Sequence, residues 1–481
     1  MVEILARSLS AILGIVGTSF LLPIFVAWWF GEYRHLGDFA IPLVGSWLLA
    51  LLFKFRSRGK VFVGGVQNAF IIVGSVWVAI GFFGALPLYA CGAFPSFVDA
   101  LFESVSGFTT TGASVLGDVE SLPRCINFWR CQTHWLGGLG VIALAVALVP
   151  ILGVGGSRLI QAETSGPEKG KLTARIADTA KILWLIYLTL TAVQAGLLYW
   201  FGMDAFDSIC HAFSTLGTGG FSTRNASLAS FANPAAEWIC TVFMLLASIN
   251  FGVYYQICLG RWSDIRDNTE LRGFLFLVFP LIAGVALLQG CATGTWGEAI
   301  RHAGFQVASI VSTTGFMSND YTTWVPAAQL LVLVLFFTGG CSGSTAGGIK
   351  IIRWSVLAKE LRNDVLRLLH PHGVFTLRIN GVPGKSDVVT VVGSFIFVYF
   401  MLVLLTAFVG TLCGQDLYTA FTAALSMVGN VGPAFGALGP SENFGGQPAI
   451  LKLWYCFAML AGRLEVYTLL ILVGRSFNRR K

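Results

Sequence analysis

Long apolar stretches alternate with short amphipathic segments along this chain. Ten stretches have the roughly 20 residues that a bilayer core needs, and they lie near residues 8–30, 38–53, 65–90, 128–152, 176–202, 235–259, 273–290, 324–352, 388–413 and 447–474. Four other segments are too short to span, near 97–108, 204–214, 298–311 and 416–426. The pattern predicts an all-α polytopic membrane protein with four re-entrant pore helices.

The four short segments end alike, in Thr-Thr-Gly, Thr-Leu-Gly, Thr-Thr-Gly and Met-Val-Gly. Their glycines are Gly112, Gly217, Gly315 and Gly429, which recur at intervals of 105, 98 and 114 residues. Asp99, Asp204 and Asp416 each lie thirteen residues before such a glycine. This near-regular repeat predicts four pseudo-repeated helix–pore-helix–helix units around one central pore. Two extra transmembrane helices precede them. The predicted divisions are 1–60 for these two helices, 61–160, 161–262 and 263–358 for the first three units, and 359–481 for a cytosolic loop with the fourth unit.

A Thr-x-Gly segment behind a short helix is suited to dehydrating a cation. Backbone carbonyls turned toward a common axis replace the water around the ion, and glycine permits that turn because it has no Cβ. The alternative is that these glycines only let transmembrane helices pack closely.

Composition supports the membrane prediction. Hydrophobic residues make up 55% of the chain and charged residues 11%, with a mean hydropathy of +0.75. The first apolar stretch lacks an Ala-x-Ala-like cleavage site and runs on to Trp28 and Trp29, so a retained helix is predicted. Most of the 31 lysines and arginines fall on one side of the predicted spans, which places both termini in the cytoplasm. Contact with anionic lipid headgroups accounts for the net charge of +7 without nucleic acid.

A glycine-rich run, residues 339–348, interrupts the apolar stretch after the third unit's short segment. Helix propensity is low there, and unwound backbone at membrane depth is tolerated only when buried or lining a watery cavity. The run therefore predicts a gate beneath the pore, and a simple helix kink is the alternative. Its candidate gating residues are Gly339, Gly340, Ser342, Gly343, Ser344, Thr345, Gly347 and Gly348.

Among the charged residues within apolar or pore segments, Arg463 and Glu103 are candidates for a role in transport. Arg463 is midway through the last apolar stretch and is predicted to face the cavity or the glycine run. The alternative is a structural arginine bonded to helix-end carbonyls. Glu103, in the first short segment, is the filter-adjacent acid that is a candidate for a proton relay.

Recognisable catalytic groupings are absent from the sequence, so an enzyme is not predicted. Gly343 to Lys350 looks like a phosphate-binding loop, but Ile349 stands where the lysine must be. The ten cysteines and six histidines show no convincing metal spacing. A coupled transporter of an organic solute normally shows inverted repeats, whereas these four repeats are parallel.

The chain resembles the TrkH-type membrane subunit of the Trk/Ktr/HKT potassium transporter superfamily. The resemblance rests on six segments: Ser106–Ser114, His134–Gly140, Phe213–Ser222, Ser312–Phe316, Gly343–Lys350 and Gly429–Pro433. It implies K⁺ uptake across the bacterial inner membrane by a homodimer, gated by a cytosolic TrkA-like nucleotide-binding ring. The basic segment 350–385 is expected to contact that ring. A Na⁺- or H⁺-coupled symporter remains the alternative.

The resemblance also implies a K⁺ filter and a cavity arginine, Arg463. The filter residues carried onto this chain are Thr110, Thr111, Gly112, Thr215, Leu216, Gly217, Thr313, Thr314, Gly315, Met427, Val428, Gly429 and Asn430. Met427 departs from threonine at the first filter position, so an innermost site formed by hydroxyls would have three sides. We therefore expect K⁺ over Na⁺ selectivity to be less than strict.

Overall fold

The structure is a computed structural model that describes residues 2–56, 66–152, 176–383 and 387–464. Regular structure in these residues is helical, apart from a two-residue pairing of β1 (Arg378–Ile379) with β2 (Val382–Pro383). The basic residues within 153–175 and 465–481, which contributed to the predicted orientation, lie outside the described residues.

One helical hairpin, with two arms, precedes the repeated part of the fold. The first arm is α1 (Val2–Ser19) followed by α2 (Leu21–Trp29), and the second is α3 (Leu36–Arg56). Phe20, at the α1–α2 junction, is fully buried, and its ring centroid lies 4.7 Å from that of Trp129. This contact anchors the N-terminal helices to the first repeated unit.

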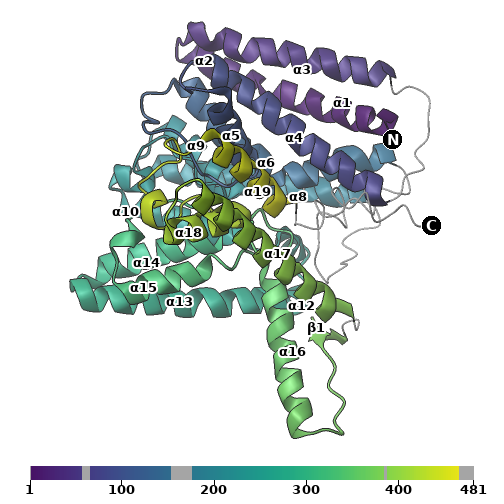
Figure 1. The fold of residues 1–481 in the computed structure, drawn as a ribbon, viewed down its shortest axis with the longest axis vertical. Coiled ribbons are helices and arrows are strands. Elements are labelled where there is room, and N and C mark those ends of the chain that lie inside the picture. Colours follow the sequence, from purple (N-terminus) through teal and green to yellow (C-terminus); the bar gives the residue numbers. More distant parts are fainter. Residues whose placement is uncertain (1, 57–65, 153–175, 384–386, 465–481) are drawn as a thin grey trace.

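Four successive units follow, each with a long helix, a short helix and a second long helix or its broken equivalent. They are α4 (Val66–Ala90), α5 (Phe97–Phe108) and α6 (Arg124–Leu152); α8 (Ile176–Trp200), α9 (Ala205–Gly217), α10 (Pro234–Ser248) and α11 (Phe251–Cys258); α13 (Thr269–Thr293), α14 (Trp296–Val311), α15 (Pro326–Leu335) and α16 (Ile351–Leu369); and α17 (Asp387–Leu412), α18 (Leu417–Gly429) and α19 (Ala449–Arg463). Figure 1 shows α1 and α3 along one edge of the molecule and α13 to α15 along the opposite edge, with α5, α9 and α18 between them.

Two of the ten predicted spans are interrupted, and the end of the last one, 465–474, lies outside the described residues. In the part of the chain that the structure describes, six helices are long and apolar enough to cross a membrane, or seven if α10 and α11 count as one bent span. These two helices meet at an angle of 91°. The predicted span 324–352 is also broken, because α15 ends at Leu335 and α16 begins at Ile351.

Three of the four short helices, α5, α9 and α18, begin at a residue whose side chain caps the helix. The side chains of Ser96, Asp204 and Asp416 accept hydrogen bonds from the backbone N–H three residues on, at 3.2, 2.8 and 3.0 Å. Such caps satisfy backbone donors that the first helical turn leaves unpaired. At 1.5 Å per residue, helices of 12 to 16 residues are about 18–24 Å long, which is shorter than a bilayer core of about 30 Å.

Candidate functional site: a ring of four backbone turns

Each short helix ends in the same backbone turn. The first turn residue has a positive φ of 55° to 57°, and the residue two positions later is a glycine with φ between 79° and 99°. The pairs are Thr110 and Gly112, Thr218 and Gly220, Thr313 and Gly315, and Asn430 and Gly432. Few side chains tolerate such angles, so glycine at the second position follows from the backbone itself.

The four turns close into a ring in chain order. A Cβ added to each glycine would collide with a backbone carbonyl oxygen of the next unit: Gly112 with Gly219, Gly220 with Thr314, Gly315 with Val431, and Gly432 with Thr111. The last contact returns to the first unit. Every glycine therefore allows the neighbouring strand to approach, which is the arrangement that a shared axial cation site requires.

The ring corrects the predicted register in the second and fourth units. Gly217 and Gly429 are the last residues of α9 and α18, and the ring glycines lie three positions further on, at Gly220 and Gly432. The predicted residues Thr215, Leu216, Met427 and Val428 are buried inside these helices. In the first and third units, the predicted segments Thr110–Gly112 and Thr313–Gly315 do lie in the ring.

A serine six residues before the glycine marks the observed register in every unit. Its carbonyl accepts a hydrogen bond, of 2.8 to 3.0 Å, from the residue that precedes the ring glycine. The donor and acceptor pairs are Thr111 and Ser106, Gly219 and Ser214, Thr314 and Ser309, and Val431 and Ser426. This serine spacing is visible in the sequence, and it distinguishes the two registers.

Oxygen atoms without partners lie at the first turn position. The hydroxyl of Thr110 and the side-chain carbonyl of Asn430 are buried and have no hydrogen-bond partner. The Asn430 amide nitrogen donates to the Thr111 hydroxyl at 2.9 Å and to the Met459 carbonyl at 3.0 Å. An unpaired buried oxygen costs free energy unless something else binds it. These two oxygens therefore fit a cation at the bottom of the ring.

Buried polar contacts stabilise the ring. The Glu103 carboxylate accepts bonds from the Ser114 hydroxyl at 2.9 Å, the Val115 N–H at 3.0 Å and the Arg130 guanidinium at 2.8 Å. The hypothesis of Glu103 as a proton relay is thus less favoured, because its carboxylate is fully engaged in structural contacts. In the second unit His211 bonds the Ser222 hydroxyl at 2.9 Å in the equivalent place.

Exposed hydrogen bonds join the first two units above the ring. The Asn225 side chain donates to Asp118 at 2.9 Å and accepts from the Val119 N–H at 2.7 Å. The Asn225 amide lowers the pKa of Asp118 below its ordinary value, with help from the Glu120 N–H. This acid therefore remains ionised near the mouth of the ring at neutral pH.

The glycine-rich run lies directly below the ring as an extended loop. The Gly347 N–H donates to the hydroxyl of the turn residue Thr313 at 2.6 Å. The loop also meets the break between α10 and α11, where the Cys341 N–H donates to the Ser248 carbonyl at 2.8 Å and the Phe251 N–H donates to the Gly343 carbonyl at 3.1 Å. The two broken helices are thus joined by backbone hydrogen bonds at one place.

Arg463 contacts the same loop. Its guanidinium donates to the Thr345 carbonyl at 2.8 Å and to the Gly137 carbonyl at 3.0 Å. Two hydroxyls of the loop donate to other carbonyls, Ser344 to that of Cys341 and Thr345 to that of Ala247. The arginine therefore ties the loop to α6 through backbone carbonyls.

The fold defines a class: an all-helical, multi-pass membrane transport protein. A family model described as "Cation transport protein", TrkH, matches residues 49–478, and the chain belongs to this family. It is 39% identical over 426 residues to the Trk system potassium uptake protein TrkH of Halomonas elongata, covering 86% of each chain. It is 38% identical over 421 residues to that of Escherichia coli K12, again covering 86% of each. The crystal structure of the potassium transporter TrkH from Vibrio parahaemolyticus matches with a TM-score of 0.85 at 33% identity, over 99% of both chains. These relatives are transporters and not enzymes.

Proposed function

We propose that this chain carries K⁺ into the cell across the bacterial inner membrane, with both termini in the cytoplasm. The single observation that supports this most is the closed ring in which each glycine faces a carbonyl oxygen of the next unit. The names of its relatives, potassium uptake proteins at 38% to 39% identity, agree with it.

The proposed filter uses the register seen in the ring. Its segments are Thr110–Gly112, Thr218–Gly220, Thr313–Gly315 and Asn430–Gly432. Carbonyl oxygens of these turns replace the hydration shell of K⁺, and the hydroxyls of three threonines with the Asn430 side chain form the innermost site. Because the fourth unit breaks the symmetry of that site, we propose that selectivity over Na⁺ is incomplete.

The proposed gate is the loop from Gly339 to Gly348 together with Arg463. A loop bonded to Thr313 obstructs the path below the filter, and a fixed guanidinium beside it raises the barrier for cations. Opening requires the loop to leave both contacts. We propose passive flux over H⁺-coupled symport, because the filter-adjacent Glu103 is held in a buried ion pair with Arg130.

The proposed partner is a cytosolic nucleotide-binding ring of the TrkA type, acting on a homodimer of this chain. Helix α16 continues directly from the loop and projects from the bundle (Figure 1). Its apolar side chains Leu361 and Leu368 are 66% and 82% exposed, as suits a surface that a partner covers. Cysteines at Arg362 and Arg367 should crosslink to that ring. Retention of nucleotide control after deletion of residues 360–384 would disprove this coupling route.

Ion flux into proteoliposomes tests the transport function itself. The purified chain should carry K⁺ and Rb⁺ down their gradients, and Na⁺ more slowly. Flux that requires a proton or sodium gradient would favour the coupled alternative. No flux of any monovalent cation, with or without such gradients, would refute the proposal.

A further inference from the structure

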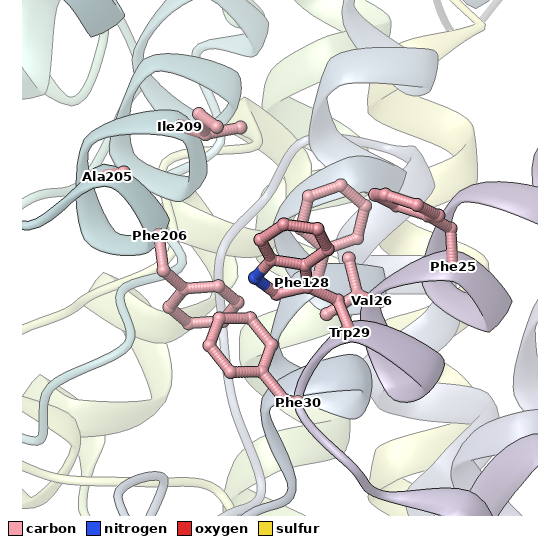
Figure 2. A pocket seen from close by; sticks show the side chains of 8 residues that line it. All are labelled: Phe25, Val26, Trp29, Phe30, Phe128, Ala205, Phe206 and Ile209. Atoms are coloured by element: carbon pink, nitrogen blue, oxygen red, sulfur yellow. The ribbon is translucent and has the colours of Figure 1, made fainter.

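An open apolar groove lies between α2, α6 and α9, away from the pore. Its volume is about 250 Å³. It is lined by Phe25, Val26, Trp29, Phe30, Phe128, Ala205, Phe206 and Ile209. Figure 2 shows the rings of Phe30 and Phe206 facing each other at one end, with Ile209 toward the other. The groove thus joins an N-terminal helix to the short helix of the second unit.

The positively charged side chain of Arg124 lies over the aromatic end of the groove. The Arg124 guanidinium carbon lies 4.4 Å from the ring centroid of Phe30 and 5.7 Å from that of Phe206. These two rings meet edge to face, 5.6 Å apart. Arg124 is exposed and forms no ion pair with any residue in the described ranges.

The acid that lies next to Arg124 is already used by the backbone. Glu32 accepts hydrogen bonds from the N–H groups of Arg124 and Cys125, at 2.7 and 2.9 Å. The Arg124 side chain therefore remains available to an external anion.

Exposed aromatic side chains place this end of the groove at a membrane boundary. Trp28, Trp29 and Tyr33 are 56%, 67% and 61% exposed, and they follow one another where α2 ends. Tryptophan and tyrosine gather at the level of lipid headgroups. Arg124 then lies at headgroup depth, and the groove extends from it toward the hydrocarbon.

We propose that the groove holds one acyl chain of an anionic glycerophospholipid whose phosphate pairs with Arg124. The apolar lining suits the acyl chain. The guanidinium has the opposite charge to the phosphate, and its planar set of N–H donors can form two parallel hydrogen bonds to it. Ala205, Phe206 and Ile209 belong to α9, which ends at the filter turn of the second unit. The bound lipid therefore packs against a helix that positions the ring.

Native mass spectrometry of the purified full chain tests this site. The probes are phosphatidylglycerol and phosphatidylcholine with identical acyl chains, added after delipidation in detergent. The parent should retain one phosphatidylglycerol about tenfold more tightly than phosphatidylcholine. Arg124→Gln should abolish that preference. Ala205→Trp, which fills the groove, should weaken retention of both lipids.

Arg34→Gln is the matched control, because Arg34 is exposed near the same boundary and is not one of the residues that line the groove. Its lipid preference should equal that of the parent. A loss equal to that of Arg124→Gln would show general attraction to the surface and overturn the site. Unchanged retention in Ala205→Trp would also overturn it. The site would also be overturned if Ala205→Trp dissociated a dimer of this chain while lipid retention stayed constant. The groove would then be an interface between copies.

Discussion

The Arg130 guanidinium lies 2.7 Å from the Glu103 carboxylate, and the two side chains are 2% and 0% exposed. Glu103 belongs to the short helix α5 and Arg130 to α6, the long helix that follows it. The same arginine donates to the Ser222 carbonyl of the second unit at 3.3 Å. One buried ion pair therefore links the short helix of the first unit to the segment that follows the ring turn of the second unit.

Breaking this pair should weaken both the fold and the filter. Removing one partner of a buried ion pair costs about 3–5 kcal/mol, because the other charge is left uncompensated. Arg130→Gln should therefore lower the thermal stability of the purified protein and reduce its K⁺ over Na⁺ permeability ratio. Arg272→Gln is the control, since its pair with Asp267 is exposed on both sides, at 61% and 73%, and is worth at most about 1 kcal/mol. Equal effects of the two variants would refute the bracing role.

Removing Arg463 should open the gate without any partner. A hydrogen bond to a charged group contributes about 1.5–3 kcal/mol, which corresponds to about 10- to 150-fold in an equilibrium constant. Arg463→Ala should raise basal flux about tenfold or more, and deletion of residues 341–345 should do the same. Selectivity should change less than rate. Proteoliposome flux measures both, with Arg362→Ala on the exposed face of α16 as a control that leaves basal flux unchanged. If neither variant conducts more than the parent while folded, the gate lies elsewhere.

Completing the innermost ring of hydroxyls should sharpen selectivity. Asn430 has the same positive φ as the three threonines Thr110, Thr218 and Thr313. Asn430→Thr should raise the K⁺ over Na⁺ permeability ratio severalfold. Met427→Thr should leave that ratio nearly unchanged and lower stability instead, because Met427 is fully buried within α18. A larger change of the ratio in Met427→Thr, read from reversal potentials, would contradict the register of the ring.

Local chemistry explains which elements the sequence could predict. The first short helix, expected near 97–108, is Phe97–Phe108 in the structure, since Ser96 caps it and its amphipathic pattern is clear. The interruption at 339–348 was predictable because glycine disfavours helix. In both cases the signal lies in neighbouring residues.

Tertiary contacts explain what the sequence could not predict. The break between α10 and α11 falls at Ile249 and Asn250, where neither glycine nor proline marks it. The loop stabilises it instead, through hydrogen bonds to Ser248 and Phe251. In the second and fourth units the ring turn lies about one helical turn after the predicted segments, because Thr215-Leu-Gly217 and Met427-Val-Gly429 imitate the expected pattern. The contacts between units show which glycine faces a neighbouring carbonyl, and the serine six residues before each ring glycine is the sequence signal that marks it.

The central claim is that the four ring glycines form the ion filter, and Gly432 and Gly429 provide a matched pair to test it. Gly432 has φ of 99° and faces the Thr111 carbonyl, whereas a Cβ at Gly429 would come no closer than 3.3 Å to its nearest neighbour, the Tyr399 hydroxyl. The measurement is the reversal potential of proteoliposomes under opposed K⁺ and Na⁺ gradients. Gly429→Ala should retain the K⁺ preference of the parent, and Gly432→Ala should lose it. A Gly432→Ala protein that keeps the parent's K⁺ preference would contradict the account.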